Sequence, residues 1–132
     1  MQLLTQTVQD YMESSVLCWL ATSNKNNLPN VSPKEIFCYH YKNGQESILI
    51  ANIASPGSLK NIKVNPQVCL SFIDVLIQKG YQIHGNVKLI HQNDEDFDSL
   101  SVELEKMTSG VYPFTSIFQI FPTRINTNSV LD

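Results

Sequence analysis

The hydrophobic residues of this chain fall into short runs rich in β-branched and aromatic side chains, a pattern typical of strands. The predicted strands cover residues 16–22, 31–41, 46–51, 68–73 and 117–121, and the stretch 75–90 supplies two more strands or one long bent strand. Asn43-Gly44 lies between two runs and is the strongest hairpin signal, because both positions tolerate positive φ. Successive hairpins predict a mainly β protein with peripheral helices, in which about six antiparallel strands form a small Greek-key barrel.

Two longer segments have helical spacing, residues 3–14 and residues 93–110. Asn93 or Asp94 is expected to cap the second helix, and Gly110 fits just past its end. The predicted inward stripe of this second helix consists of Phe97, Leu100, Leu104 and Met107.

Glycine and proline residues indicate turns, bulges and strand ends in the second half of the chain. Gly80 and Gly85 predict a turn, a bulge or a close backbone approach within the stretch 75–90. Pro122 is expected to limit the last strand, and residues 126–132 are expected to form a loose tail.

The stretch 47–74 predicts an anion site. It runs from a strand through a loop of small residues into a short helix, with Ser58 as the expected N-cap and Asn65-Pro66 at the end. The first N–H groups of a helix lack intrahelical partners and favour a phosphate. Ser55 and Ser58 would add hydroxyl donors and Lys60 would add charge, although the same pattern also suits a capped helix that binds nothing.

Composition removes several classes of protein. The chain of 132 residues has a net charge of −3 with scattered lysines, so it lacks the clustered basic face that a nucleic-acid groove needs. No apolar stretch approaches the length of a membrane helix, and the N-terminus does not resemble a signal peptide. Three well-separated cysteines without a CxxC pair predict buried, reduced thiols in a cytoplasmic protein.

No catalytic motif can be found by spacing. The chain lacks Gly-x-Gly-x-x-Gly, Walker A, Gly-x-Ser-x-Gly and His-Glu-x-x-His patterns, and its three histidines lie in separate segments. A metal site is therefore not expected. If the protein is catalytic, a bound cofactor is expected to supply the chemistry.

Three segments in order carry a resemblance: VLCWLATSNKNNLPNVSPKEIF, ILIANIASPGSLKNIKVNPQVCLSFID and GYQIHGNVKLI. Together they resemble the FMN-binding split-barrel family related to pyridoxamine 5′-phosphate oxidase. The resemblance spans about residues 5–92, and SIFQIFPTRI is similar to the closing strand of the family. It implies a single split-barrel domain, a homodimer, and FMN in clefts at the subunit interface.

The resemblance also implies a set of cofactor-binding residues. The second strand would face the flavin ring, the end of the strand before the short helix would follow the ribityl chain, and the helix start would hold the phosphate. The partner chain would close the cleft through Tyr81, Gln82 and the region of Phe114. The implied residues of the cleft's own chain are Val31, Ser32, Pro33 and Lys34, then Ile50, Ala51 and Asn52, then Ser55, Ser58 and Lys60.

One departure from the family concerns the phosphate. Many members carry an Arg-Lys pair that would fall on Gly57 and Ser58 of this chain. The loss of charged donors forfeits bonds worth about 1.5–3 kcal/mol each. Lys34 or Lys60 compensates, or FMN binds more weakly, or another flavin-like ligand binds. The chain also lacks the C-terminal substrate segment of true pyridoxamine phosphate oxidases, so vitamin B6 oxidation is not expected.

Three functions therefore stay open. The first is an FMN-dependent oxidoreductase that acts on a small acceptor, the second a non-catalytic flavin carrier or sensor, and the third a barrel that binds haem or a deazaflavin or has lost its cofactor. Several candidate residues also have purely structural interpretations. Lys34 could guard an exposed sheet edge, Trp19 could lie in the core or a dimer interface, and Asn61 could bond its local backbone.

Overall fold

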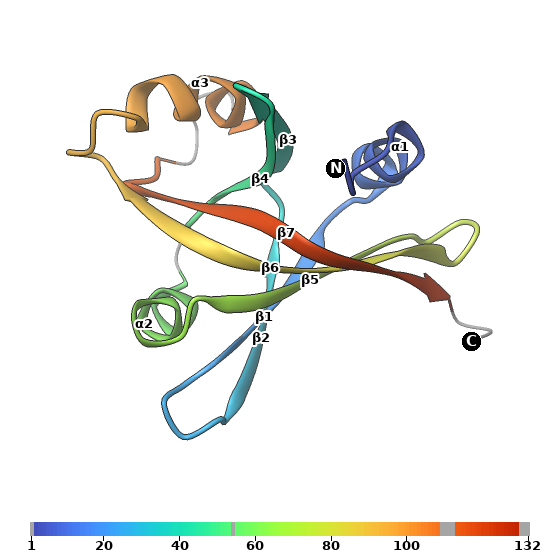
Figure 1. Ribbon diagram of the computed structural model, residues 1–132, viewed down its shortest axis with the longest axis horizontal. Helices are drawn as coiled ribbons and strands as arrows, with labels where there is room; N and C mark the ends of the chain where they lie inside the picture. Colours follow the sequence, from blue (N-terminus) through green and yellow to red (C-terminus); the bar gives the residue numbers. More distant parts are fainter. Residues whose placement is uncertain (1, 54, 109–112, 130–132) are drawn as a thin grey trace.

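The computed structural model describes residues 2–53, 55–108 and 113–129, and it consists of one strongly twisted sheet with three helices around it (Figure 1). The elements in chain order are α1 (Gln6–Ser14), β1 (Cys18–Ser23), β2 (Pro29–Lys34), β3 (Phe37–Lys42), β4 (Gln45–Ala51), α2 (Pro56–Val64), β5 (Gln67–Asp74), β6 (Lys79–His91), α3 (Phe97–Thr108) and β7 (Ser116–Ser129).

The sheet has seven strands in the order β2-β1-β5-β6-β7-β4-β3, and each neighbouring pair is antiparallel. This confirms the predicted mainly β class with peripheral helices. The prediction of one strand over residues 31–41 was wrong, because the chain leaves β2 at Glu35 and Ile36 and starts β3 on the opposite edge of the sheet. That break raises the number of strands from about six to seven.

β7 runs through Pro122 to the end of the described chain, so the prediction that proline limits the last strand was wrong. Pro122 pairs with Gly85 where the register between β6 and β7 shifts, and such a bulge tolerates the missing N–H of proline. Residues 126–128, expected to be loose, also pair with β6.

The predicted close backbone approaches at two glycines are present. A Cβ on Gly80 would collide with the carbonyl oxygen of Phe72, and one on Gly85 would lie 2.5 Å from that of Phe121. Neither position can hold a side chain unless the backbone moves, and both lie on β6, which is one long strand.

α3 begins later than predicted. The Asp94 carboxylate accepts a hydrogen bond from the His91 backbone N–H at 2.7 Å and stabilises the turn before the helix, which starts at Phe97. Met107 is 46% exposed and does not belong to the inward stripe, whereas Ser101 and Thr108 are buried. Gly110, the expected C-terminal residue of this helix, lies outside the described residues.

The core has two parts that meet along β4. Ile48 and Ile50 belong to the part that α1 covers, and Leu49 and Ala51 belong to the part beneath α3. Successive side chains of a strand point to opposite sides, so a run of continuous hydrophobic residues serves both parts. In the described part of the chain, no helix is long and apolar enough to cross a membrane.

All three cysteines are unpaired thiols on strands; Cys18 is buried as predicted, whereas Cys38 and Cys69 are only partly buried. Burial raises the pKa of Cys18 and the pKa of Cys38 to about 12. Both side chains therefore stay protonated at neutral pH, which makes them unreactive as nucleophiles.

Candidate functional site

A cavity of about 320 Å³ lies where the end of β2 approaches the end of β4. The backbone N–H of Ala51 donates to the carbonyl oxygen of Ile36 at 3.0 Å and holds the two segments together. Two of the segments predicted to bind the cofactor therefore meet at one place. The lining residues are Leu17, Pro33, Lys34, Glu35, Ile36, Ala51 and Ile53.

Lys34 is buried, so the interpretation as an exposed edge lysine was wrong. Its side chain is 4% exposed, and its Nζ lies 5.6 Å from the centroid of the Phe118 ring. Within the described residues, this Nζ has no hydrogen-bond partner. Burial lowers the pKa of Lys34 to about 8. A buried amine without an acceptor is costly, and such groups in native proteins usually have a partner or a role.

Asn52 has a second unpaired atom beside the same segment. Its Nδ2 donates to the Ser116 hydroxyl at 3.2 Å, and its backbone N–H donates to the Ser116 carbonyl at 3.1 Å. These bonds fix the side chain, while its buried Oδ1 accepts no hydrogen bond from any described residue. Two polar atoms near the ends of β2 and β4, Lys34 Nζ and Asn52 Oδ1, are thus buried without a hydrogen-bond partner among the described residues.

α2 starts at Pro56 with Ser55 as its N-cap residue, so the prediction of Ser58 as the N-cap was wrong. Proline suits the first helical position, because its missing N–H would be unpaired there in any case. Ser58 lies in the first turn and is fully buried. Its hydroxyl lies 2.8 Å from that of Ser32 on β2 and accepts from that of Ser55 at 3.1 Å. The three predicted serines therefore form one cluster, while Lys60 is exposed nearby on the helix.

Side-chain hydrogen bonds from two asparagines connect α2 to β1, and the sequence did not predict this role. Asn61 Nδ2 donates to the Thr22 hydroxyl at 3.0 Å, and Asn65 Nδ2 donates to the Ser23 hydroxyl at 2.7 Å. The prediction that Asn61 bonds its local backbone was therefore wrong. The signal in the sequence was a row of polar residues at helical spacing, Ser58, Asn61 and Asn65. A polar helix face that packs inward needs hydrogen-bond partners on the surface that it covers.

Two other predicted residues, Ile50 and Val31, do not line the cavity. Ile50 is fully buried in the core. Val31 is 58% exposed and lies opposite Ala21. Pro33 lines the cavity and lies opposite Trp19, which is 46% exposed. Trp19 is therefore not a core residue. These residues form an exposed apolar area on the outer side of β1 and β2, which we call the β1–β2 outer face.

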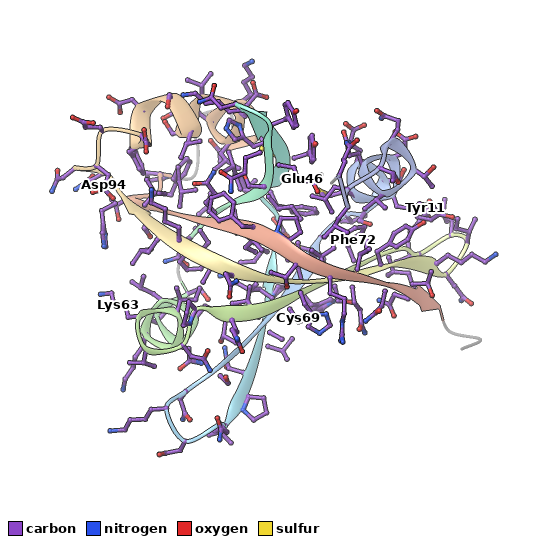
Figure 2. All side chains as sticks on the ribbon, viewed as in Figure 1. Tyr11, Glu46, Lys63, Cys69, Phe72 and Asp94 are labelled. Atoms are coloured by element: carbon purple, nitrogen blue, oxygen red, sulfur yellow. The ribbon has the colours of Figure 1, made fainter. Side chains whose placement is uncertain are left out.

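Tyr81 and Gln82 lie on β6 and do not line the cavity of their own chain. The Tyr81 ring packs edge-on against Tyr11, with 5.5 Å between the ring centroids, and its centroid lies 6.3 Å from that of Phe72. Figure 2 labels Tyr11 on α1 and Phe72 on β5. Phe114 packs against Phe97 under α3 at 6.0 Å. Any contact of these residues with a cofactor would require the cleft of a second subunit.

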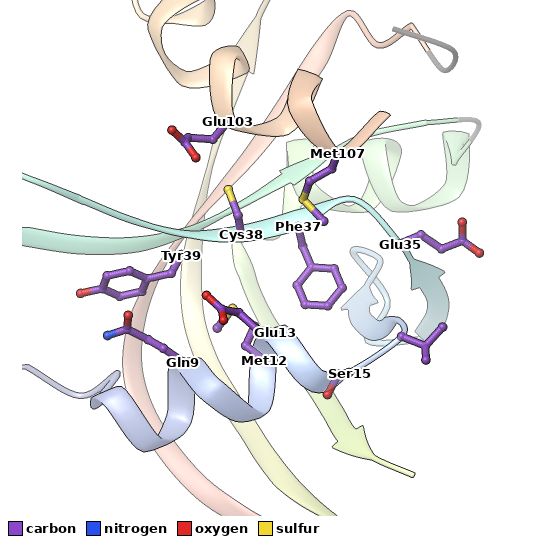
Figure 3. A pocket seen from close by; sticks show the side chains of 11 residues that line it. Gln9, Met12, Glu13, Ser15, Glu35, Phe37, Cys38, Tyr39, Glu103 and Met107 are labelled. Atoms are coloured by element: carbon purple, nitrogen blue, oxygen red, sulfur yellow. The ribbon is translucent and has the colours of Figure 1, made fainter. Parts of the chain in front are cut away.

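A larger cavity, of about 420 Å³, lies between α1 and α3 over β3 (Figure 3). Its walls carry the carboxylates of Glu13, Glu35 and Glu103, beside the Cys38 thiol. Three carboxylates disfavour a phosphate-bearing ligand. Of the described residues lining this cavity, none belongs to the predicted cofactor set, and the described chain holds no group of three or more residues suited to a metal ion.

The fold is a split barrel, and solved structures that share it include an FMN-binding protein and a putative pyridoxamine 5′-phosphate oxidase. The family model described as pyridoxamine 5′-phosphate oxidase matches residues 4–128. The chain belongs to this family, as its sequence predicted.

Solved structures agree with this assignment. HupZ of Group A Streptococcus superposes with a TM-score of 0.77 at 18% identity, covering 96% of this chain and 94% of that chain. An FMN-binding protein from Syntrophomonas wolfei has a TM-score of 0.72 at 15% identity, covering 98% and 88%. HutZ, the haem storage protein from Vibrio cholerae, has a TM-score of 0.63 at 16% identity, covering 96% and 94%. Such identities show the fold alone. A search of curated proteins found no match.

Proposed function

We propose that this protein binds FMN in the cavity between β2 and β4 and serves as a flavin-dependent oxidoreductase for a small acceptor. The observation that carries the proposal is the pair of buried, unpaired polar atoms, Lys34 Nζ and Asn52 Oδ1, at segments that the family resemblance assigns to the cofactor. A flavin offers both acceptors and donors, so the residues present fit this group.

The chain's own residues would bind and orient the cofactor. Lys34 would donate to an acceptor on the ligand, and Asn52, held by Ser116, would accept from a hydroxyl or N–H. The cluster of Ser32, Ser55 and Ser58 at the start of α2 would receive the phosphate. When bound, FMN supplies electron transfer, and the protein sets geometry and access.

We further propose a homodimer that completes the cleft. The β1–β2 outer face exposes Trp19 and Val31, and such apolar area suits a subunit interface. Because Tyr81 and Gln82 lie away from the cavity of their own chain, they would act in the cleft of the partner subunit.

Titration of FMN against the purified protein, followed by quenching of flavin fluorescence, tests the proposal. Dissociation constants in the micromolar range or below are expected, with weaker binding by Lys34→Met and Ser58→Ala. Lys25→Met serves as a control, since Lys25 is an exposed residue of the β1–β2 turn. Unchanged affinity in both site variants would remove the assigned roles.

A non-catalytic flavin carrier is the second candidate. It is favoured by the cavity lining, which offers only Lys34 and Glu35 as ionisable groups among its described residues. Oxidation of NAD(P)H in the presence of added FMN distinguishes the two candidates. A haem titration tests the third candidate, a barrel that binds haem. The described residues that line the cavity include no histidine.

A further inference from the structure

A row of three side chains crosses the sheet on the side away from the core. His84 on β6 lies directly opposite Cys69 on β5 and directly opposite Arg124 on β7. Next to His84 and Cys69 along their strands are Ile83 and Leu70, which are fully buried in the core. Because successive side chains of a strand point to opposite sides, the row lies on the outer side of the sheet.

A second cavity, of about 370 Å³, lies at this row, where the register between β6 and β7 shifts. His84 pairs with Arg124 but Gly85 pairs with Pro122, so Thr123 is the extra residue of a bulge. The Thr123 hydroxyl donates to the His84 carbonyl oxygen at 3.2 Å and fixes that bulge. Bulges are frequent beside functional sites, because they redirect the side chains around them.

The lining of this bulge cavity is polar and carries a positive charge. Gln67 and Asn86 lie opposite each other on β5 and β6 and add two side-chain amides beside His84 and Arg124. None of the described residues that line it is acidic. The bulge cavity and the cavity between β2 and β4 have no described lining residue in common, so they are separate sites.

Arg124 is the one arginine in the chain, and it is exposed. Among the described residues, its guanidinium has no ion pair with a carboxylate. Burial raises the pKa of the Cys69 thiol, and the positive charge of Arg124 opposes that rise, so the guanidinium lies near the row. A guanidinium presents a planar fork of donors that matches the two oxygens of a carboxylate.

The His84 ring offers a second donor. Its Nδ1 is buried, and no described residue forms a hydrogen bond with it. Orphaned N–H groups are rarer in folded proteins than unpaired acceptors, so we expect the neutral ring to carry its proton on Nε2. Nε2–H is then the donor that His84 brings to the cavity that it lines.

We propose that the bulge cavity binds the carboxylate group of a small molecule, which Arg124 holds through its fork and His84 through Nε2–H. The proposal does not rest on flavin binding. One carboxylate charge balances the single fixed positive charge of the described lining, whereas a phosphate dianion would leave a charge unpaired. The amides of Gln67 and Asn86 suit polar groups on the rest of the molecule.

The test is a titration with lactate, a small carboxylate, and separately with inorganic phosphate, followed by proton–nitrogen correlation NMR. Because the chain has one arginine, its Nε–H gives a single side-chain signal of known origin. This signal and the ring signals of His84, identified by their loss in His84→Phe, should move with lactate and reach saturation. Phosphate should bind more weakly than lactate.

Three variants separate the site from general attraction of anions. Arg124→Lys keeps the charge but loses the planar fork, and it should weaken lactate about tenfold when binding is followed at the His84 ring. His84→Phe should weaken lactate several-fold when binding is followed at the arginine signal. Lys79→Gln, which removes an exposed charge from the same strand as His84, should leave the affinity unchanged.

Shifts that do not saturate, unchanged affinity in Arg124→Lys, or an equal loss in Lys79→Gln would overturn the site. Tighter binding of phosphate than of lactate would overturn the carboxylate as its ligand. Nitrogen shifts that place the ring proton on Nδ1 would remove the donor role of His84. Circular dichroism checks the fold of each variant, and Arg124→Lys decides the outcome where His84→Phe impairs folding, because Arg124 is exposed.

Discussion

Lys34 and Cys18 lie directly opposite each other in the antiparallel pair of β2 and β1, with both side chains buried inside the barrel. The thiol is neutral and offers the amine no charge of opposite sign. The barrel thus encloses an ionisable amine that nothing in the described chain hydrogen-bonds. A buried amine without a hydrogen-bond partner lowers the stability of the folded protein.

The unliganded protein should be stabilised when Lys34 is made neutral. Lys34→Met should raise the free energy of unfolding at pH 7 by on the order of 1–3 kcal/mol, because it removes an unpaired buried group. Between the folded pKa of about 8 and the unfolded value of 10.5, the unfolded chain holds more protons, so this amine makes wild-type stability rise with pH. The advantage of the variant should therefore shrink over that range.

Urea denaturation at pH 7 and at pH 10.5 measures this difference. Comparison with Lys25→Met removes effects of net charge, because Lys25 is exposed. An advantage of Lys34→Met that persists unchanged to pH 10.5 would contradict the assignment.

Gly57→Arg should increase FMN affinity by about tenfold, the value of one charge-assisted bond. Gly57 is exposed in the first turn of α2, and a Cβ there would meet only Asn30 Nδ2 at 3.9 Å, so a side chain fits. Fluorescence titration should show no gain for riboflavin. An equal gain for both flavins would place the phosphate elsewhere.

Asn61→Ala should destabilise the protein by about 1–3 kcal/mol, because it leaves the buried Thr22 hydroxyl without its donor. Thermal unfolding measures the loss. In a double-mutant cycle, Thr22→Val should recover part of it, since both polar partners are then absent. Strictly additive losses would show that the Asn61–Thr22 bond is not the cause.

Trp19→Arg should convert the proposed dimer into a monomer and weaken flavin binding, because Trp19 lies on the β1–β2 outer face and not in the core. Light scattering coupled to size-exclusion chromatography gives the mass, and circular dichroism reports whether the fold is retained. Leu28→Arg is a matched control at an exposed apolar residue beside the β1–β2 turn. A wild-type protein that is already monomeric would refute the dimer.

The amino-acid sequence by itself determined the class of fold, the Asn43-Gly44 hairpin and the family, because these depend on local pattern and on motifs in order. It also placed Gly80 and Gly85 correctly at close backbone approaches. It could not show that Pro122 is tolerated within β7, since the bulge that accepts it arises from pairing with a distant strand.

Only the tertiary structure decided the character of the candidate site. The sequence places Lys34 in a strand, but the side of the strand that is buried depends on the register with β1, which puts this lysine opposite Cys18. In the same way, Ser58 and Asn61 became buried partners of Ser32 and Thr22 once α2 packed on β1 and β2. Burial and pairing are properties of segments that meet in space, and a local pattern does not encode them.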